Sequence, residues 1–202
     1  MSTIIRPYDS PLASIPPLAV KVVSLPTPLT TIDLRMLSDE QLRAIIGRAQ
    51  REQERRSQVT IHFDLDGTLA DLYGVPNWLT YLENHNPYPY AIATPLVNLA
   101  VLARKLNSLQ RKGYRISIIS WLAKSSTAEY DARVGVAKAQ WLAQHLPSVN
   151  WDEVHIVPYG TPKEQFCTTS ADILFDDEER NRKNWTGRAY DVHNILEVLS
   201  TL

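Results

Sequence analysis

Two aspartates separated by one residue are the clearest candidates for chemistry in this sequence. Asp64 and Asp66 come directly after the apolar stretch Val59–Phe63, and they are followed by Gly67 and Thr68. Branched and aromatic side chains favour a strand, whereas aspartate and glycine disfavour one, so a buried strand is predicted to end near Asp64. Ligands bind at the carboxyl ends of strands in open α/β sheets, which is where these carboxylates would lie.

Such a pair of carboxylates can carry out phosphoryl transfer. Asp64 can attack phosphorus and form an aspartyl-phosphate, while Asp66 can protonate the leaving oxygen and then activate water. A divalent cation is also needed, because the nucleophile and the phosphate repel each other. Gly67 would let backbone N–H groups approach phosphate oxygens, and Thr68 adds a hydroxyl. The alternatives are an Asp-Gly surface turn and an EF-hand calcium loop, although two apolar residues follow where further calcium ligands would be expected.

The Asp-x-Asp-Gly-Thr sequence at 64–68 resembles the first motif of the haloacid-dehalogenase-like (HAD) phosphohydrolases. The three later motifs of that family have counterparts in the same order. Ser120 ends an apolar stretch, Lys163 follows a Gly-Thr-Pro loop, and Asp176 and Asp177 end another apolar stretch. Adjacent carboxylates at a buried strand end repel each other unless a cation or hydrogen bonds offset their charge, so this last match is the rarest of the three.

The resemblance covers roughly residues 59–200 and implies a magnesium-dependent phosphomonoesterase of the HAD type. In that family's mechanism Asp64 is the nucleophile, Asp66 is the general acid and base, and Ser120 and Lys163 hold the phosphate. An aspartate at position 66 also favours phosphoester hydrolysis over the family's dehalogenases and cation pumps. Mg²⁺ is a hard cation that prefers oxygen, and its implied ligands are Asp64, the Asp66 carbonyl and Asp176, with Asp177 ordering its waters. The expected substrate-binding residues are Gly67, Thr68 and Trp121.

Strands and helices alternate after the first motif. In chain order we first expect a helix from Thr94-Pro95 to Gly113, the strand ending at Ser120, and a helix opened by a Ser126/Glu129 capping box. Strands at 154–157 and 173–175, a short strand near 189–190 and a helix at 194–199 should follow. This alternation predicts right-handed crossovers and therefore an α/β fold, a Rossmann-like parallel sheet flanked by helices.

The motif spacing indicates a minimal or absent cap domain. About fifty residues separate the first motif from Ser120, about forty separate Ser120 from Lys163, and ordinary elements use most of both intervals. Residues 70–93, rich in tyrosine and proline and with a short helix at 77–83, could form a small lid whose rings stack on a nucleobase, or could simply pack against the body. We expect an open site that admits bulky substrates.

A small phosphorylated substrate, nucleotide-like, is favoured, in the style of the 5'(3')-deoxyribonucleotidase branch of the family. One alternative is a phosphatase of nucleic-acid ends, in which Arg180, Arg182, Lys183 and an arginine-rich helix would contact the polymer. The other is a non-catalytic HAD-fold module that docks through its N-terminal arm.

Residues 1–57 differ in composition from the core predicted at 58–202. Prolines at six positions before residue 30 exclude helix and predict an extended arm, which could cover its own core or contact another subunit or partner. Ser38 and Gln41 form a capping box for a helix with the apolar stripe Leu42, Ile45, Ile46 and Ala49. Its arginine-rich end, 48–56, suits a solvated face better than a nucleic-acid contact.

The overall composition excludes several classes of protein. The net charge of −1 gives no general attraction to nucleic acid or to anionic membranes, and the single cysteine, Cys167, excludes an intrachain disulfide framework. The five histidines are scattered without zinc-like spacing. Since neither a signal peptide nor a long apolar run is visible, we expect a cytoplasmic protein with no membrane contact.

Overall fold

The computed structural model describes residues 37–202, except for the side chains of 51–53 and 55–57. The predicted proline-rich arm, apart from Leu37, therefore lies outside the described residues. So do most of the side chains in the arginine-rich part of the first helix. This helix, α1 (Asp39–Ser57), begins as predicted: the Gln41 N–H donates to the Ser38 hydroxyl, and the Ser38 N–H donates to the Gln41 side chain.

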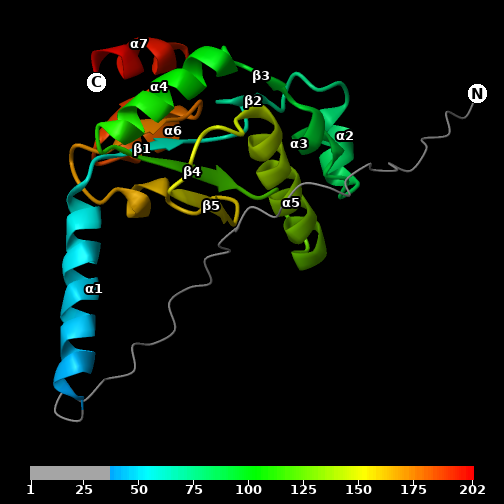
Figure 1. The fold of residues 1–202 in the computed structure, drawn as a ribbon. Helices are drawn as coiled ribbons and strands as arrows, with labels where there is room; N and C mark the ends of the chain where they lie inside the picture. Colours follow the sequence, from blue (N-terminus) through cyan, green and yellow to red (C-terminus); the bar gives the residue numbers. More distant parts are fainter. Residues whose placement is uncertain (1–36) are drawn as a thin grey trace, which may run out of the picture.

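A parallel sheet of five strands forms the centre of the molecule (Figure 1). Its strands are β1 (Thr60–Phe63), β4 (Arg115–Trp121), β5 (Glu153–Val157), β6 (Ile173–Phe175) and β7 (Arg188–Tyr190). They lie in the order β5-β4-β1-β6-β7, and every neighbouring pair is parallel. The predicted α/β, Rossmann-like fold is confirmed, and each strand lies within one or two residues of its predicted place.

Helices cover both faces of the sheet. The helices α4 (Leu99–Arg111), α5 (Ala128–His145) and α7 (Ile195–Thr201) bury the apolar residues of one face, among them Phe63, Ile118 and Phe175. The opposite face packs against Phe166 of the short 3₁₀ helix η2 (Lys163–Phe166) and against Trp185, which follows α6 (Glu179–Asn184). A further 3₁₀ turn, η3 (Val192–Asn194), precedes α7. Because both faces are covered, functional groups can gather only at the strand ends.

Residues 70–95 form a small insertion beside the sheet rather than a cap domain. It contains β2 (Ala70–Asp71), α2 (Trp78–Glu83), α3 (Tyr88–Ile92) and β3 (Thr94–Pro95). The predicted short helix at 77–83 is confirmed as α2, whereas α3 was not predicted. Tyr90 of α3 packs against Tyr130 and Val134 of α5, which fixes the insertion to the body.

Two predicted helix starts are wrong. Thr94-Pro95 does not open a helix, because it pairs with Ala70-Asp71 as an antiparallel strand; α4 begins at Leu99 instead, capped by the Asn98 side chain. The cap of α5 is Thr127, whose hydroxyl accepts from the Tyr130 N–H at 3.2 Å, rather than the predicted Ser126. Among the described residues, no helix is both long and apolar enough to span a bilayer.

Candidate active site

The chain places its acidic residues at the crevice of the sheet. From β1 it passes outward to β4 and β5 on one side, and it then returns to β6 and β7 on the other. In sheets of this kind, ligands bind outside the strand ends where the winding reverses, which here lies between β1 and β6. Asp64 follows β1 and Asp176 follows β6. The Asp64 N–H donates to the Phe175 carbonyl at 2.9 Å, which ties the two strand ends together.

Three carboxylates meet at this crevice. Asp64, Asp176 and Asp177 each offer an oxygen, and these atoms lie within 4.8 Å of one another. Lys163, from η2, places its Nζ 2.7 Å from an Asp176 oxygen and 3.1 Å from an Asp64 oxygen. Asn181, from α6, donates to both Asp176 oxygens at 3.1 Å. The Asp64–Asp176–Asp177 set is called the acidic cluster.

The charges of the acidic cluster do not balance. Burial and the neighbouring Asp64 carboxylate raise the pKa values of Asp176 and Asp177. Burial alone would lower the pKa of Lys163, but Asp64 and Asp176 outweigh it and raise that pKa. Three carboxylates against one ammonium leave two negative charges, which one divalent cation would neutralise. Carboxylate oxygens are also the donors that Mg²⁺ prefers, so the residues fit the predicted metal.

The predicted substrate residues Gly67 and Thr68 lie against Asp177. The Thr68 hydroxyl is buried, accepts from the Asp177 N–H at 3.1 Å and is 3.4 Å from an Asp177 carboxylate oxygen. Gly67 has φ +77°, and a Cβ there would lie 2.5 Å from an Asp177 oxygen and 2.8 Å from the Tyr73 ring. Its N–H donates to the Ala70 carbonyl at 2.8 Å. In this structure both residues shape the turn that holds Asp177.

Asp66 is paired with a lysine that the sequence analysis did not single out. Lys138 of α5 is completely buried, and its Nζ lies 2.5 Å from an Asp66 carboxylate oxygen and 2.8 Å from the Ser120 hydroxyl. Burial raises the pKa of Asp66; Lys138 opposes this shift, and the nearby Asp64 charge adds to it. Ser120 is buried as well, so both it and Lys163 lie beneath the surface that a ligand would first meet.

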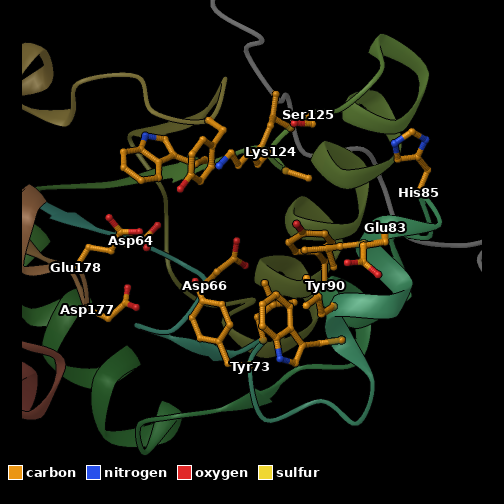
Figure 2. Close-up of a pocket in the computed structure, with 18 of the residues that line it drawn as sticks. Asp64, Asp66, Tyr73, Glu83, His85, Tyr90, Lys124, Ser125, Asp177 and Glu178 are labelled. Atoms are coloured by element: carbon orange, nitrogen blue, oxygen red, sulfur yellow. The ribbon is translucent and has the colours of Figure 1, made fainter.

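A cavity of about 450 Å³ opens beside these groups (Figure 2). Asp64, Asp66 and Asp177 lie at one end of it, and Glu83 and His85 lie at the other. The side walls are largely aromatic: the insertion contributes Tyr73, Trp78 and Tyr90, and the core contributes Trp121 and Tyr159. A volume of this size is within the usual range for small-molecule sites.

Trp121 is the predicted substrate residue that lines the cavity. Its indole N–H donates to the Thr161 carbonyl at 2.8 Å, which holds the ring in place. The Lys163 Nζ lies 5.1 Å from the ring centroid and the Arg180 guanidinium carbon 5.2 Å from it. Beside it, the Lys124 Nζ lies 5.9 Å from the centroid of Tyr159. This wall therefore presents two aromatic rings, each in contact with a cationic side chain.

Two of the basic residues predicted to contact a polymer, Arg182 and Lys183, already bind partners within the protein. Arg182 donates to the carbonyls of Asp176 and Asp177, at 2.7 and 2.6 Å, and so holds the acidic turn. Lys183 pairs with Glu179 at 2.8 Å in an exposed position. None of the described side chains of α1 lines the cavity, and this helix leads into the amino end of β1, opposite the site.

Two residues of the site, Lys138 and Asn181, were missed from the sequence. Lys138 did leave a signal, because it occupies the buried stripe of Val134, Trp141 and Leu142, where helical spacing calls for an apolar side chain. A lysine in such a stripe needs a buried partner. Asn181 left none, because nothing local distinguishes it within a short polar helix.

Comparisons with known proteins do not identify a function. No family model and no curated protein matches the sequence. Among solved structures, a chain of the Pnkp1/Rnl/Hen1 complex is similar with 17% identity and a TM-score of 0.42, over 67% of this chain and 46% of that one. The D,D-heptose 1,7-bisphosphate phosphatase from Burkholderia thailandensis is similar with 12% identity and a TM-score of 0.42, over 71% of this chain and 99% of that one. The chain thus spans less than half the length of the first of these.

Proposed function

We propose that the protein is a magnesium-dependent phosphomonoesterase that acts through an aspartyl-phosphate on Asp64. The observation that carries the proposal is the acidic cluster, in which Asp64, Asp176 and Asp177 offer oxygens within 4.8 Å of one another. Asp66 lines the same end of the cavity. A nucleophilic carboxylate, a second carboxyl group within reach and a set of oxygen donors for a cation are what phosphate-ester hydrolysis needs.

The residues divide the reaction into two steps. In the first, an Asp64 oxygen forms a bond to phosphorus as the bond from phosphorus to the ester oxygen breaks, and protonated Asp66 gives its proton to that oxygen. In the second, Asp66 takes a proton from water, the water oxygen bonds to phosphorus, and the bond to Asp64 breaks. Lys163 keeps the Asp64 carboxylate in place through the contact at 3.1 Å and offsets its charge toward the incoming phosphate.

Mg²⁺ held by Asp64, Asp176 and the Asp66 carbonyl, with Asp177 at the same cluster, would supply positive charge toward the phosphate oxygens. The fixed partners of these carboxylates support this role. Asn181 and Lys163 orient the Asp176 carboxylate, and the Thr68 hydroxyl donates to an Asp177 carboxylate oxygen, so the oxygens are placed before a ligand binds.

A nucleotide-like substrate suits the cavity. With its phosphate at Asp64, the remainder of the molecule would lie between Tyr73, Trp78 and Tyr90 on one side and Trp121 and Tyr159 on the other. Aromatic walls favour a planar group, because rings stack on nucleobases without requiring a particular base. A sugar phosphate has no planar ring to stack between these walls, so we expect nucleoside monophosphates to be hydrolysed faster than sugar phosphates.

The test is phosphate release from nucleoside monophosphates, sugar phosphates and end-phosphorylated oligonucleotides, with Mg²⁺ and with EDTA. The variant Asp64→Asn should lose at least about a thousandfold in kcat, because the nucleophile itself is removed. Asp39→Asn, an exposed change in the first turn of α1, is the matched control and should retain full activity. Equal inactivity of wild type and Asp64→Asn on every substrate would contradict the proposal and favour the non-catalytic module.

A phosphatase of nucleic-acid ends is the second candidate. It is favoured by the two cation–aromatic pairs of the cavity wall, Arg180 with Trp121 and Lys124 with Tyr159, which could contact a second nucleotide. Binding to several phosphates releases counterions, so activity on oligonucleotides would fall steeply as salt rises from 50 to 200 mM, roughly tenfold or more. Mononucleotide hydrolysis would change little over the same range.

A further inference from the structure

Lys138 is a buried cation that the proposed reaction does not itself use. Lys138 and Lys163 are the lysines with fully buried side chains among residues 37–202, at 0% and 1% exposure. Lys163 contacts the nucleophile, whereas Lys138 comes from the other side, from the middle of α5. With no exposed surface and no place in the cavity lining, Lys138 cannot touch a substrate. Any effect it has on the reaction must pass through its neighbours.

Every donor of the Lys138 ammonium group has a partner. The Nζ lies 2.5 Å from an Asp66 carboxylate oxygen and 2.8 Å from the Ser120 hydroxyl, and it also donates to the Trp121 carbonyl. The Tyr90 ring lies 5.0 Å away and closes the remaining side. These partners come from the loop after β1, the end of β4 and the insertion. One side chain thus joins the three segments that surround the proposed reacting groups.

Packing alone does not account for a lysine at this position. Its neighbours on the buried stripe of α5 are Val134, Trp141 and Leu142, so an apolar side chain would complete the same surface. Burying an ammonium group is costly unless it is paired and hydrogen-bonded, and replacing a buried ion pair by apolar residues is often neutral or stabilising. The lysine therefore points to a requirement of the site rather than of the fold.

This requirement of the site concerns the position of Asp66, the proposed general acid. A general acid must lie within hydrogen-bond reach of the oxygen it protonates, and small displacements reduce catalysis strongly. Asp66 lines the cavity (Figure 2), where its side chain is 14% exposed. One of its carboxylate oxygens contacts Lys138. Lys138 thus holds one carboxylate oxygen of Asp66, while the carboxyl group remains beside Asp64.

We propose that Lys138 is the positioning residue for Asp66 and Ser120, a role that rests on the phosphomonoesterase function proposed above. Lys138 keeps its own proton throughout. Its task is to hold the Asp66 carboxyl group toward the ester oxygen in the first step and toward water in the second. Through the Ser120 hydroxyl, it couples that orientation to the end of β4.

The first experiment compares two esters in the length-matched variant Lys138→Met. With an alkyl phosphate, such as a nucleoside 5'-monophosphate, the leaving oxygen needs a proton, so kcat should fall about a hundredfold. With 4-nitrophenyl phosphate the leaving group needs little protonation, so the first step continues while the second slows. The expected signature is a burst of about one nitrophenolate per enzyme molecule followed by slow turnover. Lys105→Met, a lysine of α4 that contacts Ser200, is the control and should behave as wild type.

The second experiment places Lys138→Met in the Asp66→Asn background. If Lys138 acts through Asp66, the double variant should be no slower than Asp66→Asn alone, because the group being positioned is already lost. A further loss that multiplies with the first would overturn the proposal, and so would an equal fall on both esters without a burst. Thermal unfolding of all variants identifies any simple loss of folding, and the double variant, which lacks both charges, should fold even if Lys138→Met does not.

Failure of the proposed function would be distinguishable from failure of this inference. If wild type and Asp64→Asn release no phosphate from either ester, the phosphomonoesterase proposal falls and the inference falls with it. If wild type is active and Asp64→Asn is not, the function stands. Wild-type rates for Lys138→Met on both esters would then overturn the positioning role alone.

Discussion

At the scale of single residues, each carboxyl group assigned to the reaction has its own buried ammonium partner. Lys163 contacts Asp64, and Lys138 contacts Asp66. The lysines approach from different elements, η2 and α5, so the two aspartates are oriented independently although one residue separates them. Because an unpaired buried charge is costly, these pairs also maintain the geometry of the site before a ligand binds.

His62 is a buried polar residue that, unlike Lys138 and Lys163, has an unpaired side chain among the described residues. It is 2% exposed, and neither ring nitrogen has a hydrogen-bond partner in the described part of the chain. Its ring packs against Trp185, with the ring centroids 5.1 Å apart. Burial lowers the pKa of His62 from 6.5 to about 4, although Asp172 partly opposes the shift. The folded protein therefore holds this imidazole neutral over a range in which the unfolded chain takes up a proton.

His62 should make the folded state sensitive to acid. Its contribution is fully present above pH 6.5 and is lost as the pH falls toward 4, because the unfolded state binds the extra proton in that window. The total loss is about 3 kcal/mol. We expect His62→Leu to remove this part of the pH dependence, as measured by urea unfolding between pH 7 and pH 4.5. His193→Leu, at a side chain that is 92% exposed, is the control, and an unchanged pH dependence in His62→Leu would contradict the prediction.

At the scale of elements, the five strands of the parallel sheet were predictable and the helix starts were less so. Apolar stretches that stop at a polar residue define β1, β4 and β6, so the strand ends could be read from local sequence. Thr94-Pro95 also has a sound local signal, proline at the start of a helix. Its pairing with Ala70-Asp71, however, joins residues that are 23 and 25 positions apart. Local patterns do not encode such pairings.

The residues of the site also differ in whether local sequence or contacts between distant residues define them. The strand-end acids were found because each follows an apolar run that local sequence identifies. Lys138 was missed because its partners, Asp66 and Ser120, lie 72 and 18 positions away along the chain. The contact of the Thr68 hydroxyl with Asp177, which is 109 positions away, was not predicted either. Sequence reasoning thus found the acidic residues that lie together but not the contacts that hold them in place.

The cap of α5 offers a test on two adjacent residues. The Thr127 hydroxyl accepts from the Tyr130 N–H, so Thr127→Ala should lower the free energy of unfolding by about 1 kcal/mol. The Ser126 hydroxyl donates to the Thr127 carbonyl at 3.3 Å and caps nothing, so Ser126→Ala should change it by less than about 0.5 kcal/mol. Chemical denaturation of the two variants measures the difference directly. If Ser126→Ala lowered the free energy of unfolding more than Thr127→Ala, Ser126 would be the cap, as the sequence predicted.

At the scale of the whole molecule, α1 is separate from the packed core. The three clusters of buried residues contain none of the α1 side chains that the structure describes, and Ile45 and Ile46 are 37% and 55% exposed. Figure 1 shows α1 projecting away from the sheet. The apolar stripe predicted for this helix therefore does not stabilise the sheet, and the predicted boundary between residues 57 and 58 can be tested by truncation.

We expect the protein consisting of residues 58–202 to fold and to keep its activity. Among the described residues, every sheet strand and core cluster lies within 58–202. The free energy of unfolding in guanidinium should therefore be within about 1 kcal/mol of that of the full chain, and kcat should be unchanged. The matched control removes residues 195–202 from the other end, which takes Ile195 and Leu199 out of the core and should cost more than about 4 kcal/mol. If removal of residues 1–57 were as damaging as that control, the N-terminal segment would have to be an integral part of the fold, and the boundary would be wrong.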